Sequence, residues 1–282
     1  MNRLERMVDE IDPGLSVRLR SLKMRLGHDI GELLMREMLR PGEVAVDVGA
    51  YRGAYVHTMS VRVGRGGCVH AIDPIPGNCA RLRTIARRRG NITVHALAVS
   101  DHSGSEVLRI PIHRGHHVDA LASLEPSRRP DEDSCRVSLC TLDELLAQER
   151  RVSFLKCDVE GHEQRVFEGA TRILNRDHPV VLTEVEQRHR ADSIENTFGF
   201  FARAGYRGWF IAEDGLRPLE EFAITRDQLD LIDGRFLPYG VPKGYVSDFL
   251  FCPPGTAPPP RTRPWRCQWP HSVRERPRHL EV

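Results

Sequence analysis

Long apolar runs are missing from this 282-residue sequence, and so is a strong charge of either sign. No stretch approaches the roughly 20 apolar residues that cross a bilayer, so we expect no integral membrane segment. The formal net charge of +2 is too small to draw the chain to nucleic acid by its overall field. Residues 1–6 lack the apolar run of a signal peptide, and we therefore expect a cytoplasmic protein.

Paired cysteines are also missing, because none of the seven cysteines stands in a C-x-x-C spacing. Several lie within apolar runs, which is typical of reduced thiols in a protein core. This use of cysteine fits a reducing cytosol. No internal repeat is evident either.

The remaining composition is that of a globular protein, with 40% hydrophobic and 28% charged residues. Short apolar runs alternate with helical patterns, which predicts one parallel, doubly wound α/β sheet. We expect a helical N-terminal extension over residues 1–40, one domain over residues 41–252 and a tail over residues 253–282. The tail has eight prolines, and six arginines against two glutamates, so we expect it to be disordered.

A strand, a glycine turn and a helix over residues 44–63 have the pattern that opens an α/β nucleotide-binding unit. The strand is rich in valine, and Gly49 and Gly53 leave the backbone open to a ligand lying across the strand end. Asp73 closes the next apolar run. A carboxylate at that place can accept hydrogen bonds from ribose hydroxyls.

The carboxyl ends of several predicted strands meet at one edge of the sheet, because the crossovers are right-handed. The residues that converge there are Asp47, Gly49, Asp73, Leu97, Ala98, Val99, Asp158 and Glu184. The densest group follows the apolar strand over residues 152–157 and contains acids and a histidine. This convergence is stronger evidence for a ligand site than any single motif.

Four motifs at this edge resemble the FkbM family of S-adenosylmethionine-dependent methyltransferases. They are residues 47–53, 72–78, 98–101 and, most specifically, 155–163. The resemblance implies a class I methyltransferase-like, Rossmann-like fold with a doubly wound, mostly parallel sheet of seven strands. It also implies hydroxyl acceptors on sugars, glycolipids or other natural products. The chain departs from the family at Tyr51, where asparagine is usual, and at Asp73, where glutamate is commoner.

The same resemblance implies S-adenosyl-L-methionine as the cofactor. Asp47 is expected beside the ammonium of the cofactor and Asp73 at its ribose. Ala98 and Val99 are expected to border its adenine. The expected contacts are Asp47, Gly49, Ala50, Tyr51, Gly53, Asp73, Pro74, Ala98, Val99 and Asp158. A dinucleotide site favours a third glycine beside its pyrophosphate, but S-adenosylmethionine carries no phosphate and relaxes that demand.

Methyl transfer to a hydroxyl oxygen needs a group that assists loss of the hydroxyl proton. By residue type His162 is the expected base, and the other expected catalytic residues are Asp158, Glu160 and Glu184. Alternatively, Asp158 and Glu184 hold Mg²⁺ through carboxylate oxygens, and the ion activates the hydroxyl. The sequence leaves both routes open.

Two other classes of function use the same pattern. An NAD-dependent oxidoreductase could use Asp73, although the third glycine of G-x-G-x-x-G is missing. A non-catalytic nucleotide-binding domain would leave the acids and histidine of residues 158–162 without a role. A nucleic-acid methyltransferase is disfavoured because we find no aromatic-proline motif for a flipped base. We therefore expect a small-molecule or glycosylated hydroxyl acceptor and no nucleic acid.

Overall fold

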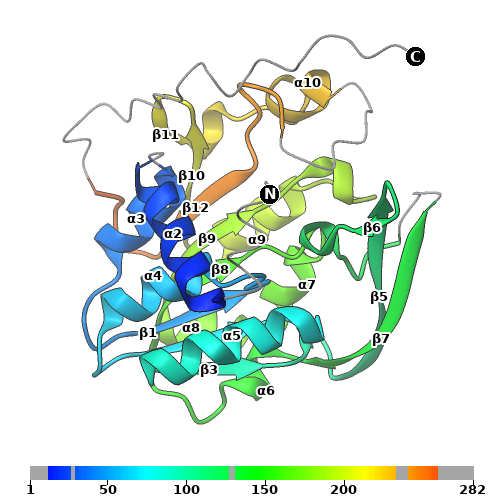
Figure 1. Cartoon of the computed structure of the whole chain (residues 1–282). Helices are drawn as coiled ribbons and strands as arrows, with labels where there is room; N and C mark the ends of the chain where they lie inside the picture. Colours follow the sequence, from blue (N-terminus) through cyan, green and yellow to red (C-terminus); the bar gives the residue numbers. More distant parts are fainter. Residues whose placement is uncertain (1–11, 27–28, 127–130, 233–240, 260–282) are drawn as a thin grey trace.

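A sheet of eight strands runs through the molecule, and helices cover both of its faces (Figure 1). The computed structural model describes residues 12–26, 29–126, 131–232 and 241–259. In spatial order the strands are β11 (Gly215–Pro218), β10 (Arg207–Ala212), β12 (Asp248–Cys252), β9 (Val180–Glu184), β8 (Val152–Cys157), β1 (Val44–Val48), β2 (Cys68–Ile72) and β3 (Ile92–His95). Strands β9, β8, β1, β2 and β3 are parallel, whereas β12, β10 and β11 pair antiparallel.

The doubly wound α/β class is confirmed, but the expected count of seven strands is wrong for this sheet. A two-residue turn at Glu213 and Asp214 returns the chain as β11, which adds an eighth strand at the edge. Residues 92–99 have the apolar pattern of a single strand, but the strand in the main sheet ends at His95. The next two-residue strand, β4 (Ala98–Val99), pairs outside this sheet.

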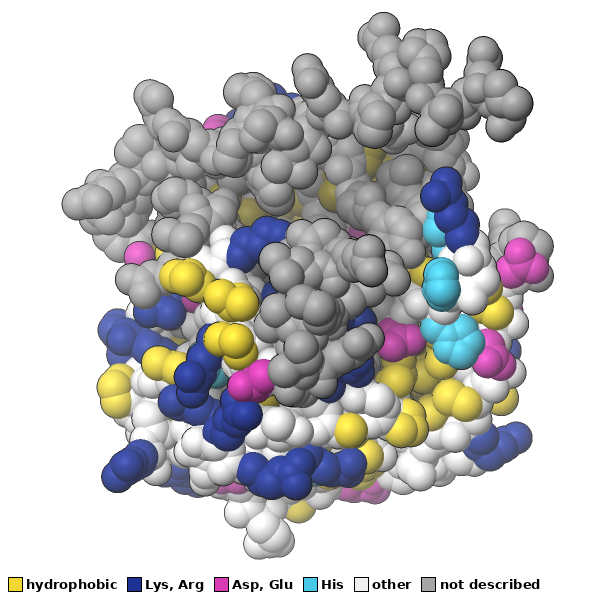
Figure 2. Space-filling model, viewed as in Figure 1, with side chains coloured by type: hydrophobic (Ala, Val, Ile, Leu, Met, Phe, Trp, Pro, Cys, Tyr) yellow, Lys and Arg dark blue, Asp and Glu magenta, His cyan; other side chains and the backbone are white. Residues whose placement is uncertain are grey.

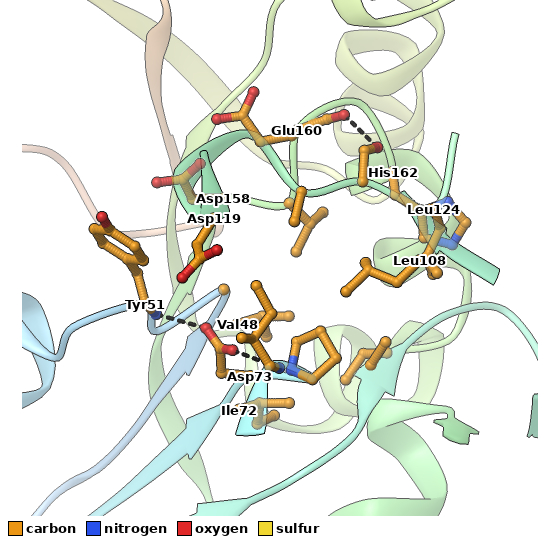
Figure 3. A pocket seen from close by; sticks show the side chains of 18 of the residues that line it. Val48, Tyr51, Ile72, Asp73, Leu108, Asp119, Leu124, Asp158, Glu160 and His162 are labelled. Carbon is orange, nitrogen blue, oxygen red and sulfur yellow. Dashed lines mark hydrogen bonds between the residues drawn. The ribbon is translucent and has the colours of Figure 1, made fainter. Parts of the chain in front are cut away.

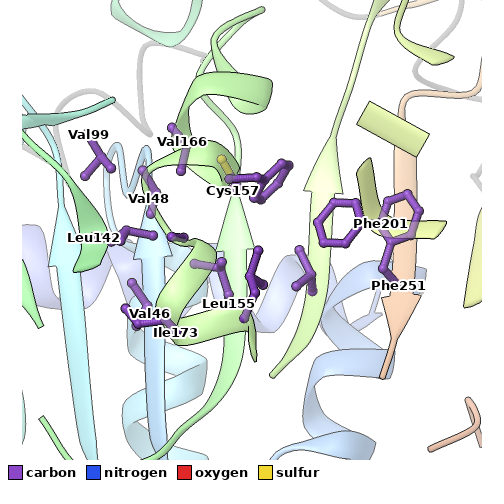
Figure 4. Close-up of a cluster of buried hydrophobic side chains, with 14 of the residues drawn as sticks. Val46, Val48, Val99, Leu142, Leu155, Cys157, Val166, Ile173, Phe201 and Phe251 are labelled. Carbon is purple, nitrogen blue, oxygen red and sulfur yellow. The ribbon is translucent and has the colours of Figure 1, made fainter. Parts of the chain in front are cut away.

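Successive residues of a strand point to opposite faces, so the sheet separates two hydrophobic cores. Val46 and Val48 of β1 pack with Leu155 of β8 beneath the helices of one face, as Figure 4 shows. These helices are α6 (Leu142–Leu145), α7 (Glu163–Glu168), α8 (Thr171–Asp177) and α9 (Glu195–Arg203). Ala45 and Phe154 face the second core.

The helices over this second core are α2 (Pro13–Leu26), α3 (Ile30–Met38), α4 (Ala54–Val63) and α5 (Pro76–Arg89). Within the expected N-terminal extension, residues 13–26 and 30–38 are helical, while residues 1–11 and 27–28 lie outside the described residues. Asp29 caps α3 by accepting the backbone N–H of Glu32 at 2.8 Å. Leu34 and Met35 are fully buried, so α3 covers the sheet.

A second sheet projects from the main one and contains β4, β7 (Glu132–Cys140), β5 (Gly104–His113) and β6 (His116–His117) in that order. We call β5, β6, β7 and the residues between them the arm (Figure 1). Residues 118–124 have the apolar pattern of a strand, but the chain forms a short helix there, η1 (Asp119–Leu121). This segment contacts β5 through the Arg109–Ser123 bridge and through the Val118 N–H, which donates to the Pro111 carbonyl at 2.8 Å.

The remaining short helices are η2 (Gln187–His189), η3 (Leu219–Glu221), η4 (Thr225–Leu229) and α10 (Asp230–Ile232). On the face drawn in Figure 2, Lys and Arg side chains gather over α5, where Arg83, Arg87 and Arg88 are exposed. Within the described residues, no helix is long and apolar enough to cross a membrane. Most of the predicted tail, residues 260–282, lies outside the described residues.

Candidate functional site

A cavity opens at the carboxyl ends of β1, β2 and β8, between the main sheet and the arm. Figure 3 shows its wall. The lining residues are Val48, Gly49, Tyr51, Ile72, Asp73, Pro74, Ile75, Leu97, Ala98, Val99, Leu108, Asp119, Ala120, Ala122, Ser123, Leu124, Asp158, Val159, Glu160 and His162. One part of the wall is apolar and the other carries carboxylates. The site therefore lies at the sheet edge that the sequence predicts.

The turn after β1 approaches β8 so closely that it requires glycine. Gly49 has a φ of +79°, and a Cβ atom at this position would overlap the carbonyl oxygen of Asp158. The N–H groups of Gly49 and Ala50 both donate to the Ile72 carbonyl at 3.0 Å. Tyr51 continues the turn with a φ of +46°. The turn is thus fixed to β2 and β8, and it holds the Tyr51 backbone at the cavity wall.

Asp73 organises the turn after β2. Its carboxylate accepts the backbone N–H of Tyr51 and of Ile75, each at 2.8 Å, and the Asn78 amide at 3.2 Å from both oxygens. Burial raises the pKa of this carboxyl to about 6, against the lowering effect of these hydrogen bonds. A carboxylate has roughly four acceptor sites, so these three donors leave about one for a ligand. Asp73 therefore both closes the turns and faces the cavity.

The other expected cofactor residues divide into two groups. Pro74, Ala98 and Val99 line the cavity. Asp47, Ala50 and Gly53 do not line it. Asp47 lies on the opposite face of β1 from Val48, and Gly53 caps α4, where a Cβ atom would meet Leu82 and Ile85 at 2.8 and 2.9 Å. Gly53 thus serves the packing of α4 on α5.

Carboxylates dominate the polar part of the wall. Asp73, Asp119, Asp158 and Glu160 line the cavity, and among the described residues that line it there is no lysine or arginine. Asp119 comes from η1 in the arm, and in Figure 3 its side chain points toward Asp73. Sequence reasoning missed Asp119 because no motif surrounds it. The cavity is consequently suited to a cationic ligand with an apolar part.

Lys156 lies behind this wall, on the face of the sheet that carries α4. Its Nζ is 3.0 Å from Asp158 Oδ2 and 4.9 Å from the centre of the Tyr55 ring. Burial alone would lower its pKa, but Asp158 and Asp47 raise it. Burial raises the pKa of Asp47 to about 6 in spite of Lys156, and Asp47 Oδ1 has no hydrogen-bond partner among the described residues.

The pair expected to hold Mg²⁺ does not fit that role. Asp158 is already paired with the Lys156 ammonium. Glu184 is not among the residues that line the cavity, and it lies opposite Asp248 in the β9–β12 register. Burial raises the pKa of Glu184 well above its ordinary value, and Asp158 adds to this. The Lys156 ammonium thus already balances the charge of Asp158, one of the two expected ligands.

His162 borders the cavity with both ring nitrogens engaged. Nδ1 is 2.7 Å from Glu125 Oε1, and Nε2 is 2.9 Å from the hydroxyl of Ser100, which donates to Asp101 at 3.0 Å. The ring is 7% exposed. A substrate hydroxyl could reach Nε2 only by replacing the Ser100 contact. The structure therefore places the expected base at the cavity wall, but both of its ring nitrogens already have hydrogen-bond partners.

Glu160 reaches the cavity from a residue with a φ of +55° and is backed by a buried ion network. His189 Nε2 is 3.0 Å from Glu160 Oε2 and 3.3 Å from Glu186 Oε1, and Arg188 donates to Glu186 Oε1 at 2.8 Å. Burial would lower the pKa of His189, but the two carboxylates raise it to about 9. Burial raises the pKa of Glu160 against the effect of His189.

The doubly wound sheet, the glycine turn and the acid-lined cavity define the class of a cofactor-binding α/β protein. The methyltransferase FkbM domain model matches residues 47–207. The chain therefore belongs to the FkbM family of S-adenosylmethionine-dependent methyltransferases. The matched segment contains all four motifs that carried the resemblance in the sequence.

Solved structures give more distant likenesses. The methyltransferase FkbM of Methylobacillus flagellatus KT is 17% identical with a TM-score of 0.45, over 85% of this chain and 55% of that one. This chain thus spans little more than half of that protein. An O-methyltransferase of Bacillus cereus in complex with SAH is 11% identical with a TM-score of 0.44, over 88% and 95% of the two chains. No match was found among curated protein sequences.

Proposed function

We propose that this chain transfers a methyl group from S-adenosyl-L-methionine to a hydroxyl oxygen of a small molecule, such as a sugar, a glycolipid or another natural product. The observation that carries this proposal is the charge of the cavity. Four carboxylates and no lysine or arginine line it among the described residues, and one wall is apolar. S-adenosylmethionine is a cation with an apolar ring, whereas NAD brings a pyrophosphate that such a wall repels.

The cofactor is assigned to residues as follows. Asp73 would accept a ribose hydroxyl at its remaining acceptor site, beside the Tyr51 backbone. Ala98 and Val99, with Ile75, would border the adenine, because they form the apolar wall. Asp119 or Asp158 would face the ammonium, in place of Asp47, which lies behind the wall. When bound, the cofactor supplies an activated methyl group for in-line displacement.

The proton acceptor we propose is Glu160. Its carboxylate lines the cavity, and burial raises its pKa, which brings a carboxylate closer to the range of an effective general base. Asp158 is less suited because the Lys156 ammonium forms an ion pair with it alone among the described residues, whereas the His189 ring beside Glu160 is shared with Glu186. His162 would then act as a positioning residue that joins Glu125 to Ser100. His162 as the base remains the competing assignment.

The acid-lined cavity also supports a small acceptor over a nucleic acid, since it would repel phosphates. The arm closes one side of the cavity, and Ser123 of the arm donates to the Glu160 carbonyl at 2.7 Å. Incubation with S-adenosylmethionine and a panel of hydroxylated sugars and natural-product extracts, followed by mass spectrometry for a methyl increment, would identify the acceptor. Methylation of RNA alone would contradict this choice.

The cofactor assignment predicts that S-adenosylhomocysteine binds and NAD does not, as measured by calorimetry. Asp119→Asn should weaken S-adenosylhomocysteine binding about 10-fold or more, because the amide oxygen still accepts a hydrogen bond but no longer carries the negative charge that strengthens its bond to the ammonium. Asp133→Asn is the matched control on the same arm, where the side chain is 57% exposed and paired with His117. Tight binding of NAD with none of the thioether ligand would overturn the cofactor assignment and favour an oxidoreductase.

The base assignment predicts that Glu160→Gln lowers kcat about 10²–10⁴-fold while S-adenosylhomocysteine affinity stays near wild type. His162→Gln, which keeps a polar side chain between Glu125 and Ser100, should lower kcat much less. The reverse order of effects would make His162 the base. Loss of activity with chelator and its recovery with Mg²⁺ would contradict both assignments.

A further inference from the structure

A separate group of potential metal ligands lies at the other end of β2, away from the cavity. Cys68 and His70 project from the same face of this strand because they are two residues apart. Glu149 comes from the segment that follows α6, and one ligand atom from each residue lies within 4.8 Å of the others. Cys68 precedes Asp73 by five residues, which is about 16 Å along a strand. The group is thus distinct from the proposed methyl-transfer site.

We propose that Cys68, His70 and Glu149 bind one Zn²⁺ ion. Thiolate, imidazole and carboxylate are the ligand types that zinc takes in proteins, and the soft sulfur disfavours Mg²⁺ and Ca²⁺. Three protein ligands leave the fourth tetrahedral position to water. On binding, the Cys68 thiol releases its proton to solvent and the sulfur forms the bond to the metal.

The distances match this assignment. Cys68 Sγ is 3.7 Å from His70 Nε2. Zinc bonds of about 2.3 Å to sulfur and about 2.05 Å to nitrogen at a tetrahedral angle put these two atoms about 3.6 Å apart. Glu149 Oε2 is 2.8 Å from the same nitrogen, where zinc needs about 3.3 Å. Because the Glu149 side chain is 22% exposed, it has room for this small movement.

The second nitrogen of His70 has the partner that a metal-bound histidine needs. His70 Nδ1 is 3.0 Å from Nε2 of His95 on β3, which pairs with β2. A ligating histidine donates its other N–H to such a neighbour, which fixes the ring and its tautomer. His70 is 6% exposed, so the ring is held in place before any ion arrives. Zinc would therefore join β2 to the chain after α6 with little rearrangement.

The other group of three potential ligands in the described residues, Glu160, Glu186 and His189, is less suited to an ion. Arg188 already donates to Glu186, and two cationic side chains balance the two carboxylates. Among the described residues, no cationic side chain lies within hydrogen-bond distance of the three proposed ligand atoms of the Cys68 group. Arg150 Nε is 3.9 Å from Oε1 of Glu149, which is not the proposed ligand oxygen. Charge and ligand type thus both favour the Cys68 group.

The experiment titrates the metal-free full chain with Co²⁺ and then with Zn²⁺. Co²⁺ should produce a thiolate-to-cobalt charge-transfer band, and Zn²⁺ should displace it. Cys68→Ser should abolish the band and weaken Zn²⁺ binding about 100-fold. Cys140→Ser is the matched control, since this half-buried thiol also lies 3.7 Å from a glutamate oxygen, that of Glu144, and it should keep both properties.

His95→Phe should keep the charge-transfer band but weaken Zn²⁺ binding about 10–100-fold, as expected for loss of the group that orients a ligand. The charge-transfer band of the unmodified chain tests the proposal even if a variant fails to fold. Absence of the band at saturating Co²⁺ overturns the proposal. So does a band that survives Cys68→Ser, because the sulfur ligand would then lie elsewhere.

Discussion

His189 is the residue whose charge most depends on its neighbours. It is almost fully buried beside Glu160 and Glu186, and they raise its pKa from 6.5 to about 9. The protonated ring is thus favoured in the folded state over the unfolded one. Its contribution to stability is fully present below pH 6.5 and is lost as the pH rises through 9.

This linkage predicts that the free energy of unfolding falls by about 2–3 kcal/mol between pH 6.5 and 9.5, as measured by denaturant unfolding. His189→Gln should flatten the dependence over this range. His116→Gln, at an exposed histidine of the arm, should leave it unchanged. Parallel curves for wild type and His189→Gln would show that the buried pairs do not hold the extra proton.

At this scale the sequence predicted the residues that end parallel strands. Asp73, Asp158 and Glu160 line the cavity because such strand ends share one edge. Asp119 could not be predicted, since it reaches the cavity through the long excursion between two strands of the arm. The position of Asp47 behind the cavity wall could not be predicted from local sequence patterns either. Its partner across the β1–β8 register is Lys156, and only the pairing of the two strands shows this.

The turn after β1 is the element on which both the fold and the cavity depend. Gly49 and Gly90 both have positive φ, +79° and +76°, but only Gly49 would place a Cβ atom against backbone, at Asp158. Gly90→Ala should therefore cost only the conformational penalty of about 1 kcal/mol. Gly49→Ala adds the overlap with the Asp158 carbonyl, so it should cost clearly more and weaken S-adenosylhomocysteine binding as well.

Thermal unfolding and calorimetry of the two variants would test this comparison. Equal losses of stability would show that the approach of the turn to β8 is not constrained. The turn itself was predictable from its glycines, whereas the arm was not. The pairing of β4 with β7 in a second sheet could not be predicted from local patterns, because it joins residues some 40 positions apart.

At the scale of the whole molecule, the α/β class follows from a regular alternation of strands and helices, which is why the sequence predicted it. The family was predicted from the resemblance of four motifs, at residues 47–53, 72–78, 98–101 and 155–163. The tail was predicted from composition alone, and residues 260–282 lie outside the described residues. Truncation after Pro259 should shift the melting temperature by less than about 2–4 °C, because a segment rich in proline and arginine brings little apolar area to bury. A larger loss would show that tail residues pack on the domain.

The cavity lies between the main sheet and the second sheet, so its walls belong to both. Ala98 and Val99 of β4 belong to the second sheet yet line the cavity, while the opposite wall belongs to the main sheet. A ligand that fills the space therefore contacts both sheets and adds to the links between them, such as those of Ser123 to Glu160 and of Ser100 to His162. Hydrogen exchange along β5 and β7 should slow when the cofactor binds, so amides that never touch it would report its presence.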